Sequence, residues 1–349
     1  TAPSVASTSP VNNGEIAKDG DITITFSEPV TLGATWYSLT CTQSSTHTAA
    51  VTDEDPVYTL NPDDNFTAGE TCLLEIYAAQ VTDDDTEDPP DTMESNFSLS
   101  FSVAYGCGDP FTAIPEIQGS GASSPLVGNV VSTEGIVTAD FQTNAYVSGT
   151  KNGFFMESLT PDADPATSEG LFIYSYLTDV HVGDHVRVTG TVKEQYNLTE
   201  LSPVTQIQVC STGNSVTPTT FSLPVTSMAD FEKFEGMYVT IPQELVIMEY
   251  YNFDQYGEIV LGTERFMQYT AVNEPDPTGY AEWTANLALN SILLDDGSEA
   301  SNPNPARHPN GQEFTLSNLL RGGDILTNVV GVMDYAFSKY RIQPTAGAD

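Results

Sequence analysis

The sequence predicts an all-β protein, and three observations support this prediction. Turn-forming residues recur about every 8 to 12 residues, and helical periodicity is scarce. Several short runs alternate apolar and polar residues, at 22–26, 72–77 and 97–103. A β-unit also occurs twice in the second half of the chain. Because an alternating strand has one apolar face, the early runs favour a β-sandwich with its core between two sheets.

In this repeat, residues 183–203 are similar in sequence to residues 323–344. From Gly190 and Gly331 onward the two copies align without a gap, which pairs Val192 with Met333, Tyr196 with Phe337, Leu201 with Ile342 and Pro203 with Pro344. Glu134-Gly135 and Glu235-Gly236 are expected to open the two copies, so the repeat has the size of a domain. Residues rich in Gly and Pro at 105–110 and 217–224 mark boundaries. We therefore expect domains at 1–105, 106–215 and 216–349.

The composition is strongly acidic. Ten Lys and Arg residues stand against 48 Asp and Glu, which gives a net charge of -38. Such a surface repels nucleic-acid phosphates and anionic lipids, and salt relieves this repulsion. No apolar run is long enough to span a membrane. The opening Thr1-Ala2-Pro3 resembles a mature terminus after removal of a secretion signal. These features predict a secreted, extracellular protein without membrane insertion.

The four cysteines form two natural pairs, Cys41 with Cys72 and Cys107 with Cys210. None has the Cys-x-x-Cys spacing typical of zinc or redox sites. Disulfides are the favoured interpretation because an extracellular setting is oxidising, and four buried free thiols are the alternative.

The first segment resembles bacterial Ig-like domains. The resemblance rests on Ser9-Pro10 to Gly14, followed by an alternating strand and the sequence Phe26-Ser27-Glu28-Pro29-Val30. It covers about 100 residues of the chain. Domains of this family act as spacers or adhesive modules, so the resemblance implies an Ig-like β-sandwich with such a role.

The remainder resembles the region that precedes the catalytic domain in large secreted bacterial endonucleases. The similarity lies in residues 114–121, 124–128, 134–141, 153–155, 182–190, 293–297, 320–324 and 340–344. It implies two β-barrels of the oligonucleotide/oligosaccharide-binding (OB) type. Residues 228–234 carry the one helical pattern of the second half, with Ser227 as its cap, and are expected to close the end of a barrel.

No catalytic constellation is recognisable in the sequence. The carboxylate, Asn and Ser-Asp-His motifs of the endonuclease domain are absent from the chain. Of the four histidines, only His181 and His185 have a metal-like spacing, and Val182-Gly183-Asp184 between them breaks a helix. The chain is therefore expected not to be an enzyme and to need no cofactor, apart from possible calcium.

Aromatic and basic residues on the first barrel are the candidates for ligand binding. OB barrels stack bases or sugars on exposed rings, and nearby cations hold phosphates. The candidates are Phe154, Phe155, Tyr174, Tyr176, Arg187, Lys193 and Tyr196. The alternative is that many of these rings belong to the core. Nucleic acid is a poor ligand for a chain this acidic, and polysaccharide stays open.

An acidic loop is the candidate for calcium. Asp83, Asp84, Asp85, Glu87 and Asp88 offer the oxygen ligands that calcium takes. Their spacing differs from an EF-hand loop, and a solvated loop is the favoured alternative. Leu294-Asp295-Asp296-Gly297 is expected to form a β-turn with Asp-Gly at its tip.

Two classes of function follow from these features. The first is a non-catalytic accessory or spacer region of a secreted nuclease-like protein. The second is an extracellular structural protein that assembles into a surface layer or fibre, through sheet edges or its termini. A carbohydrate-binding module is a further alternative.

Overall fold

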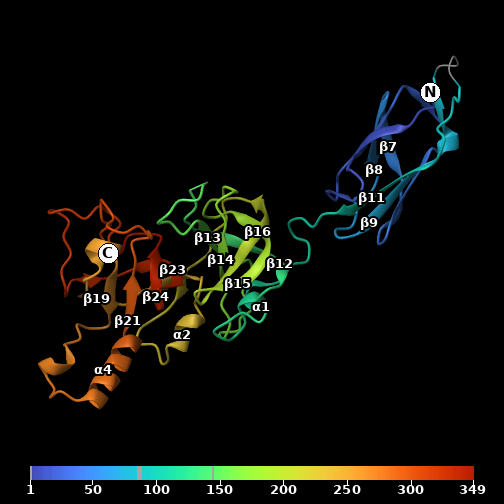
Figure 1. Ribbon diagram of the computed structural model, residues 1–349. Helices are drawn as coiled ribbons and strands as arrows, with labels where there is room; N and C mark the ends of the chain where they lie inside the picture. Colours follow the sequence, from blue (N-terminus) through green and yellow to red (C-terminus); the bar gives the residue numbers. More distant parts are fainter. Residues whose placement is uncertain (1, 85–88, 144) are drawn as a thin grey trace. The chain divides into compact units, whose positions relative to one another are not determined.

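The computed structural model describes residues 2–84, 89–143 and 145–349, and Figure 1 shows their helices and strands. The chain divides into two compact units, Thr1–Pro110 and Phe111–Asp349. The first boundary therefore lies a few residues after the predicted one. The predicted domains 106–215 and 216–349 do not form separate units. From Phe111 onward their residues belong to one unit, which contains two curled sheets. The all-β prediction is confirmed.

The first unit is a β-sandwich. One sheet has the order β1 (Val5–Ser9), β3 (Ile22–Phe26), β8 (Val57–Pro62) and β7 (Ala49–Glu54). The other has the order β2 (Gly14–Ile16), β11 (Phe97–Val103), β9 (Thr71–Ile76), β5 (Tyr37–Cys41) and β6 (Ser45–His47). A ribbon of β4 (Val30–Leu32) and β10 (Val81–Asp83) and the 3-10 helix η1 (Ala78–Gln80) complete it.

Alternation along the strands builds the core of this sandwich. In β3, Ile22, Ile24 and Phe26 are almost completely buried while the threonines between them are half-buried. Leu99 and Phe101 of β11 alternate in the same way from the opposite sheet. Each strand thus removes its apolar face from water, which is the main favourable term in folding.

The second unit begins with a closed five-stranded barrel. Its order is β12 (Val130–Asp140), β13 (Gly153–Ser158), β14 (Gly170–Tyr174), β16 (Leu198–Ser211) and β15 (His185–Gln195), and β15 pairs with β12 to close the ring. β14 and β16 are parallel and the other pairs are antiparallel. The short helix α1 (Ile114–Gln118) buries Ile114 and Ile117 in the core of this barrel. A five-stranded barrel with crossed connections is the OB-like architecture.

The second sheet repeats this order with two strands broken. Its order is β17 (Thr219–Thr220), β18 (Tyr238–Ile241), β23 (Val329–Ala336), β24 (Lys339–Pro344), β21 (Ser291–Leu294), β20 (Ile259–Gly262), β19 (Leu245–Glu249) and β22 (Ile325–Leu326). β18 and β19 together correspond to β12, and β22 and β23 together correspond to β15. Since β18 pairs with β23 and β19 pairs with β22, this eight-stranded sheet curls round in the same strand order, and we call it the second barrel.

Strand register confirms the repeat and corrects its opening. Val192 pairs with Leu201 in the first copy, and Met333 pairs with Ile342 in the second, as the alignment requires. The proposed landmark is wrong, however. Glu134 lies within β12, whereas Glu235 and Gly236 precede β18.

Gly236 instead serves the contact between the two barrels. A Cβ on Gly170 of β14 would lie 2.1 Å from the carbonyl carbon of Gly236, so both positions require glycine. Gly236 also has φ +74°, which glycine adopts at little cost. Glu235 beside it accepts a hydrogen bond from the Thr199 amide at 2.9 Å. The Glu235-Gly236 dipeptide therefore joins the barrels and does not begin a repeat.

The helical elements are few. α2 (Ala229–Glu232) is shorter than the predicted 228–234, but Phe231 is buried in the second barrel's core as expected. The longest helix, α4 (Pro277–Leu289), was not predicted, because none of its residues is buried and no apolar stripe marks it. Asp276 caps it by accepting from the Thr278 and Gly279 amides. α3 (Phe253–Tyr256) and the 3-10 helix η2 (Tyr269–Ala271) are short. Within the described residues, no helix is long and apolar enough to cross a membrane.

Candidate functional site

Three of the predicted ligand-binding residues lie in the protein interior, which corrects the prediction. Phe154 and Phe155 are completely buried, on opposite faces of β13. Phe154 belongs to the core of the first barrel, and Phe155 packs with Val332 of the second barrel. Arg187 is 4% exposed and donates to the Glu134 carboxylate at 2.7 Å. None of the three can therefore contact a ligand.

The predicted tyrosines lie at the surface of the second unit, around a groove of about 580 Å³. Tyr174 and Tyr196 line this groove directly. Tyr176 contacts Tyr174 edge-on, with ring centroids 6.3 Å apart, and contacts Tyr146 at 6.1 Å. Lys193 is exposed on β15, opposite Glu200, and does not line the groove. Two of the predicted residues, Tyr174 and Tyr196, thus line the groove, and ligand binding by them stays a prediction.

Residues of the second barrel complete the groove. Tyr335 and Phe337 line it, as does Glu299 from the loop that follows β21. None of these three residues was among the predicted ligand-binding residues. The repeat did contain a signal for Phe337, because that residue aligns with Tyr196.

A buried ion pair lies beside the groove and holds the barrels together. The Lys151 Nζ is 2.7 Å from the Asp334 carboxylate, and both side chains are almost completely removed from water. Burial disfavours the charged amine, but the carboxylates of Asp334, Glu299 and Asp295 together outweigh this effect and raise the pKa of Lys151. Lys151 thus stays charged and its charge is compensated within the protein.

A second cavity, of about 360 Å³, adjoins the groove and shares four lining residues with it: Lys151, Glu299, Ala336 and Phe337. Arg341 lies in this cavity and donates to Asp295 at 2.6 Å and to Glu258 at 2.8 Å. The predicted turn at 294–297 therefore has its aspartates buried rather than exposed at a tip. The Asp295 carboxylate accepts from Arg341, and the Asp296 carboxylate accepts from the Ser298 amide at 2.8 Å.

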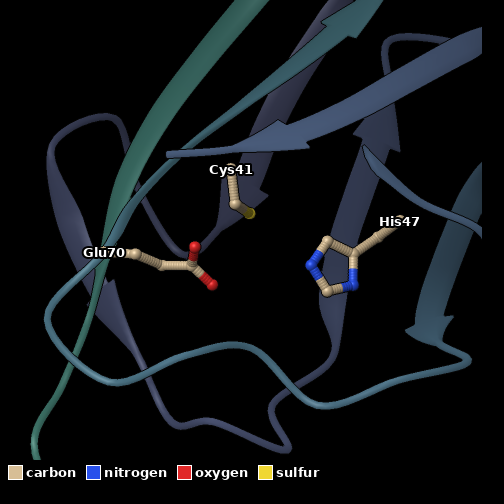
Figure 2. A group of neighbouring side chains, drawn as sticks. All are labelled: Cys41, His47 and Glu70. Carbon is tan, nitrogen blue, oxygen red and sulfur yellow. The ribbon is translucent and has the colours of Figure 1, made fainter. Parts of the chain in front are cut away.

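The first unit holds a group of side chains with metal-like spacing, Cys41, His47 and Glu70, which Figure 2 shows. Cys41 is bonded to Cys72, so its sulfur is not a thiolate. Glu70 accepts hydrogen bonds from the amides of Thr67, Gln43 and Ser44 at 2.6 to 3.0 Å. These contacts close the turn between β5 and β6. The group is therefore a structural clasp and does not fit a metal.

The Ser44 hydroxyl lies between Glu70 and His47, 2.6 Å from each. In a nucleophilic triad the histidine stands between the serine and the acid. Here the serine holds the central place, and the His47 ring packs against Phe66 with centroids 4.9 Å apart. This order provides no base that an acid orients.

A second group of possible ligands lies on the first barrel, where Glu134, His185 and Cys210 approach one another. Cys107 and Cys210 are both disulfide-bonded, and no described cysteine is free. Glu134 contacts His185 at 3.1 Å as well as Arg187. With its sulfur in a disulfide, this group does not fit a metal either.

The predicted calcium loop lies partly outside the described residues, since Asp85, Glu87 and Asp88 are not described. Asp83 belongs to β10 and is buried. The Asp84 carboxylate accepts a hydrogen bond from the Thr31 hydroxyl at 2.6 Å. Calcium binding at this loop stays a prediction.

Family models match two parts of the chain. Residues 1–103 match the bacterial Ig-like domain, which agrees with the resemblance seen in the sequence. Residues 203–348, which include the second barrel, match a domain of unknown function, DUF8508. No curated protein matches the chain. The first unit is thus a bacterial Ig-like domain.

Among solved structures, the chain is similar to "Crystal structure of the S-layer protein rSbsC(31-844)", with 14% identity, a TM-score of 0.23, and coverage of 60% of this chain and 26% of that chain. It is also similar to "Crystal structure of the N-terminal part of the bacterial S-layer protein SbsC", with 13% identity, a TM-score of 0.24, and coverage of 60% and 44%. The chain spans less than half the length of either protein.

Proposed function

We propose that this chain is a non-catalytic, extracellular structural protein whose copies associate through the edge of the Ig-like sandwich. The observation that carries the proposal is strand β7, the edge of the four-stranded sheet, where five of six residues are exposed. An exposed edge presents unpaired amides and carbonyls that can pair with a strand of another chain. The disulfides and the Ig-like fold support an extracellular setting.

Charge controls when such association can occur. With a net charge of -38, two copies repel each other at low ionic strength. The Debye length falls from about 30 Å at 0.01 M salt to about 8 Å at 0.15 M. Asp53 and Glu54 place two of these charges at the end of β7 itself. Association is therefore expected in saline or divalent-cation solutions and not in dilute buffer.

Light scattering and negative-stain imaging of the full chain, in 10 mM salt and in 150 mM NaCl with and without CaCl2, test the proposal. Val51→Lys places a cation in the middle of β7, where the native side chain is 43% exposed. Val11→Lys, outside the sheet edges and 67% exposed, makes the same charge change and is the control. Loss of assembly in Val51→Lys alone supports the proposal. Monomers under every condition would refute it.

The nuclease-accessory hypothesis makes a different prediction. A phosphodiesterase assay of the purified chain with Mg2+ or Ca2+ should show no turnover under either hypothesis. An endonuclease domain encoded directly after Asp349 would favour the accessory role over the structural one. Turnover by the 349-residue chain itself would contradict both.

A further inference from the structure

Both copies of the repeat place an exposed aromatic residue in a hairpin turn whose backbone conformation disfavours bulky side chains. The hairpin between β15 and β16 turns at Tyr196 and Asn197, with φ 55° and 66°. The hairpin between β23 and β24 turns at Phe337 and Ser338, with φ 51° and 62°. Positive φ at both turn residues favours Asn and Gly, and it is unusual for a bulky side chain.

Folding gains little from these two rings, since Tyr196 is 81% exposed and Phe337 is 77% exposed. A residue held in an unfavourable backbone conformation without burial points to a function. The Phe337 ring is also fixed in place, because the Arg341 guanidinium lies 5.4 Å from its centroid and is itself bound by buried carboxylates. The protein thus presents a preorganised ring to solvent.

Both turns line the same groove of about 580 Å³, which is a typical size for a ligand site. Tyr146 and Tyr174 line it too, and their edge-on contacts with Tyr176 limit the motion of these rings. The groove therefore combines several oriented aromatic faces from two barrels that pack together. Neither barrel provides these faces alone.

The charges of the groove identify the class of ligand. Two glutamates, Glu200 and Glu299, line the groove. Its one lining lysine, Lys151, has its charge compensated by Asp334. The whole chain carries a net charge of -38. A polyanion such as nucleic acid or a sulfated glycan is therefore repelled. A neutral sugar is not, and its apolar C–H faces can stack on rings while its hydroxyls donate to carboxylates and amides.

We propose that this groove binds a neutral oligosaccharide, with Tyr196 and Phe337 stacking on sugar rings and Glu200 and Asn197 accepting hydrogen bonds from hydroxyls. The site is separate from the β7 edge, so it does not depend on self-association. It gives the second unit a binding role within an extracellular protein.

The test is a glycan array probed with the full, fluorescently labelled chain. The array should carry neutral glucans, mannans and chitin oligosaccharides beside heparin fragments and single-stranded DNA. We expect binding to one or more neutral glycans and none to the anionic probes. Absence of binding to every neutral glycan by folded protein, or binding confined to anionic probes, overturns the proposal.

Substitutions by asparagine separate the ring from the turn. Asn suits positive φ, so Tyr196→Asn and Phe337→Asn remove the ring while keeping the hairpin. Each should weaken glycan binding roughly tenfold, by analogy with the loss of one stacked aromatic ring, without lowering the melting temperature. Tyr251→Asn removes an equally exposed ring, 84% exposed and outside the groove, and should bind as the wild type does. Equal binding by all three variants would overturn the proposal.

Discussion

Ionisation of Glu157 is expected to weaken the second unit as pH rises. Glu157 lies on β13, is 4% exposed and accepts a hydrogen bond from the Tyr238 amide of the second barrel at 2.9 Å. Burial raises its pKa to about 7, against a partly opposing effect of that hydrogen bond, and the Glu169 carboxylate adds to the rise. The glutamate is thus protonated in the folded state at pH values where it is ionised in the unfolded chain.

The sign and size of the effect follow from this difference. Between pH 4.5 and about 7 the folded state holds more protons than the unfolded state, so stability falls as pH rises through this window and levels off above it. A shift from 4.5 to about 7 corresponds to about 3 kcal/mol at most. Glu157→Gln keeps an acceptor for the Tyr238 amide but cannot ionise. It should therefore remove this part of the pH dependence.

Calorimetry and urea denaturation of the full chain at pH 5, 6, 7 and 8 provide the measurement. We expect Glu157→Gln to gain stability over the wild type as pH rises, by up to about 3 kcal/mol between pH 5 and pH 8. Glu116→Gln, at an exposed position in α1, is the matched control and should follow the wild type. Parallel curves for Glu157→Gln and the wild type would show that burial of this carboxyl has no such cost.

Three further predictions concern the clasp of the first unit and the repeated core. Replacing Cys41 and Cys72 by serine opens a loop with a sequence separation of 31 and should destabilise the first unit by about 3.7 kcal/mol in calorimetry, with the second unit's transition unchanged. Burial opposes ionisation of Glu70, yet the hydrogen bonds that the carboxylate accepts lower the pKa of Glu70 in the folded state. The ionised Glu70 therefore stabilises the fold above pH 4.5, and this stabilisation is lost as pH falls through the folded pKa. Glu70→Gln should therefore cost about 1–3 kcal/mol at pH 7 and less in acid, and an equal cost at pH 3 would contradict this. Leu201→Ala and Ile342→Ala occupy equivalent, fully buried positions and should each cost about 2–5 kcal/mol in urea denaturation; a surface-like cost at either would argue against the repeat.

The sequence predicted local pairing well because hairpin register depends on neighbouring residues. The alignment of Val192 with Met333 and of Leu201 with Ile342 was correct, since each hairpin is continuous in the chain. The same is true of the alternating strand at 22–26, whose apolar side chains all face the sandwich core. Both patterns involve residues that are close in sequence as well as in space.

Contacts between the barrels were beyond the reach of sequence patterns. β13 is buried on both faces, by its own barrel on one side and by the second barrel on the other. The sequence of such a strand does not show whether its aromatic side chains are buried or lie on an exposed ligand-binding face. Phe154 and Phe155 were therefore misassigned as ligand-binding rings. Glu235-Gly236 was misread for the same reason, because its glycine is required by the approach of β14 from the other barrel.

The candidate ligand site needs both copies of the repeated barrel, because residues of both barrels line the groove. The first barrel alone would expose the aromatic turn at Tyr196, beside Tyr146 and Tyr174, but would lack Phe337. The close approach of Gly170 and Gly236 brings the second barrel near enough for Phe337 to line the same groove. Since that approach depends on missing Cβ atoms, a substitution such as Gly236→Val should separate the barrels and open the groove without touching any residue that lines it. The binding capacity of the second unit would thus arise from how the copies pack, and each barrel fold supplies half of it.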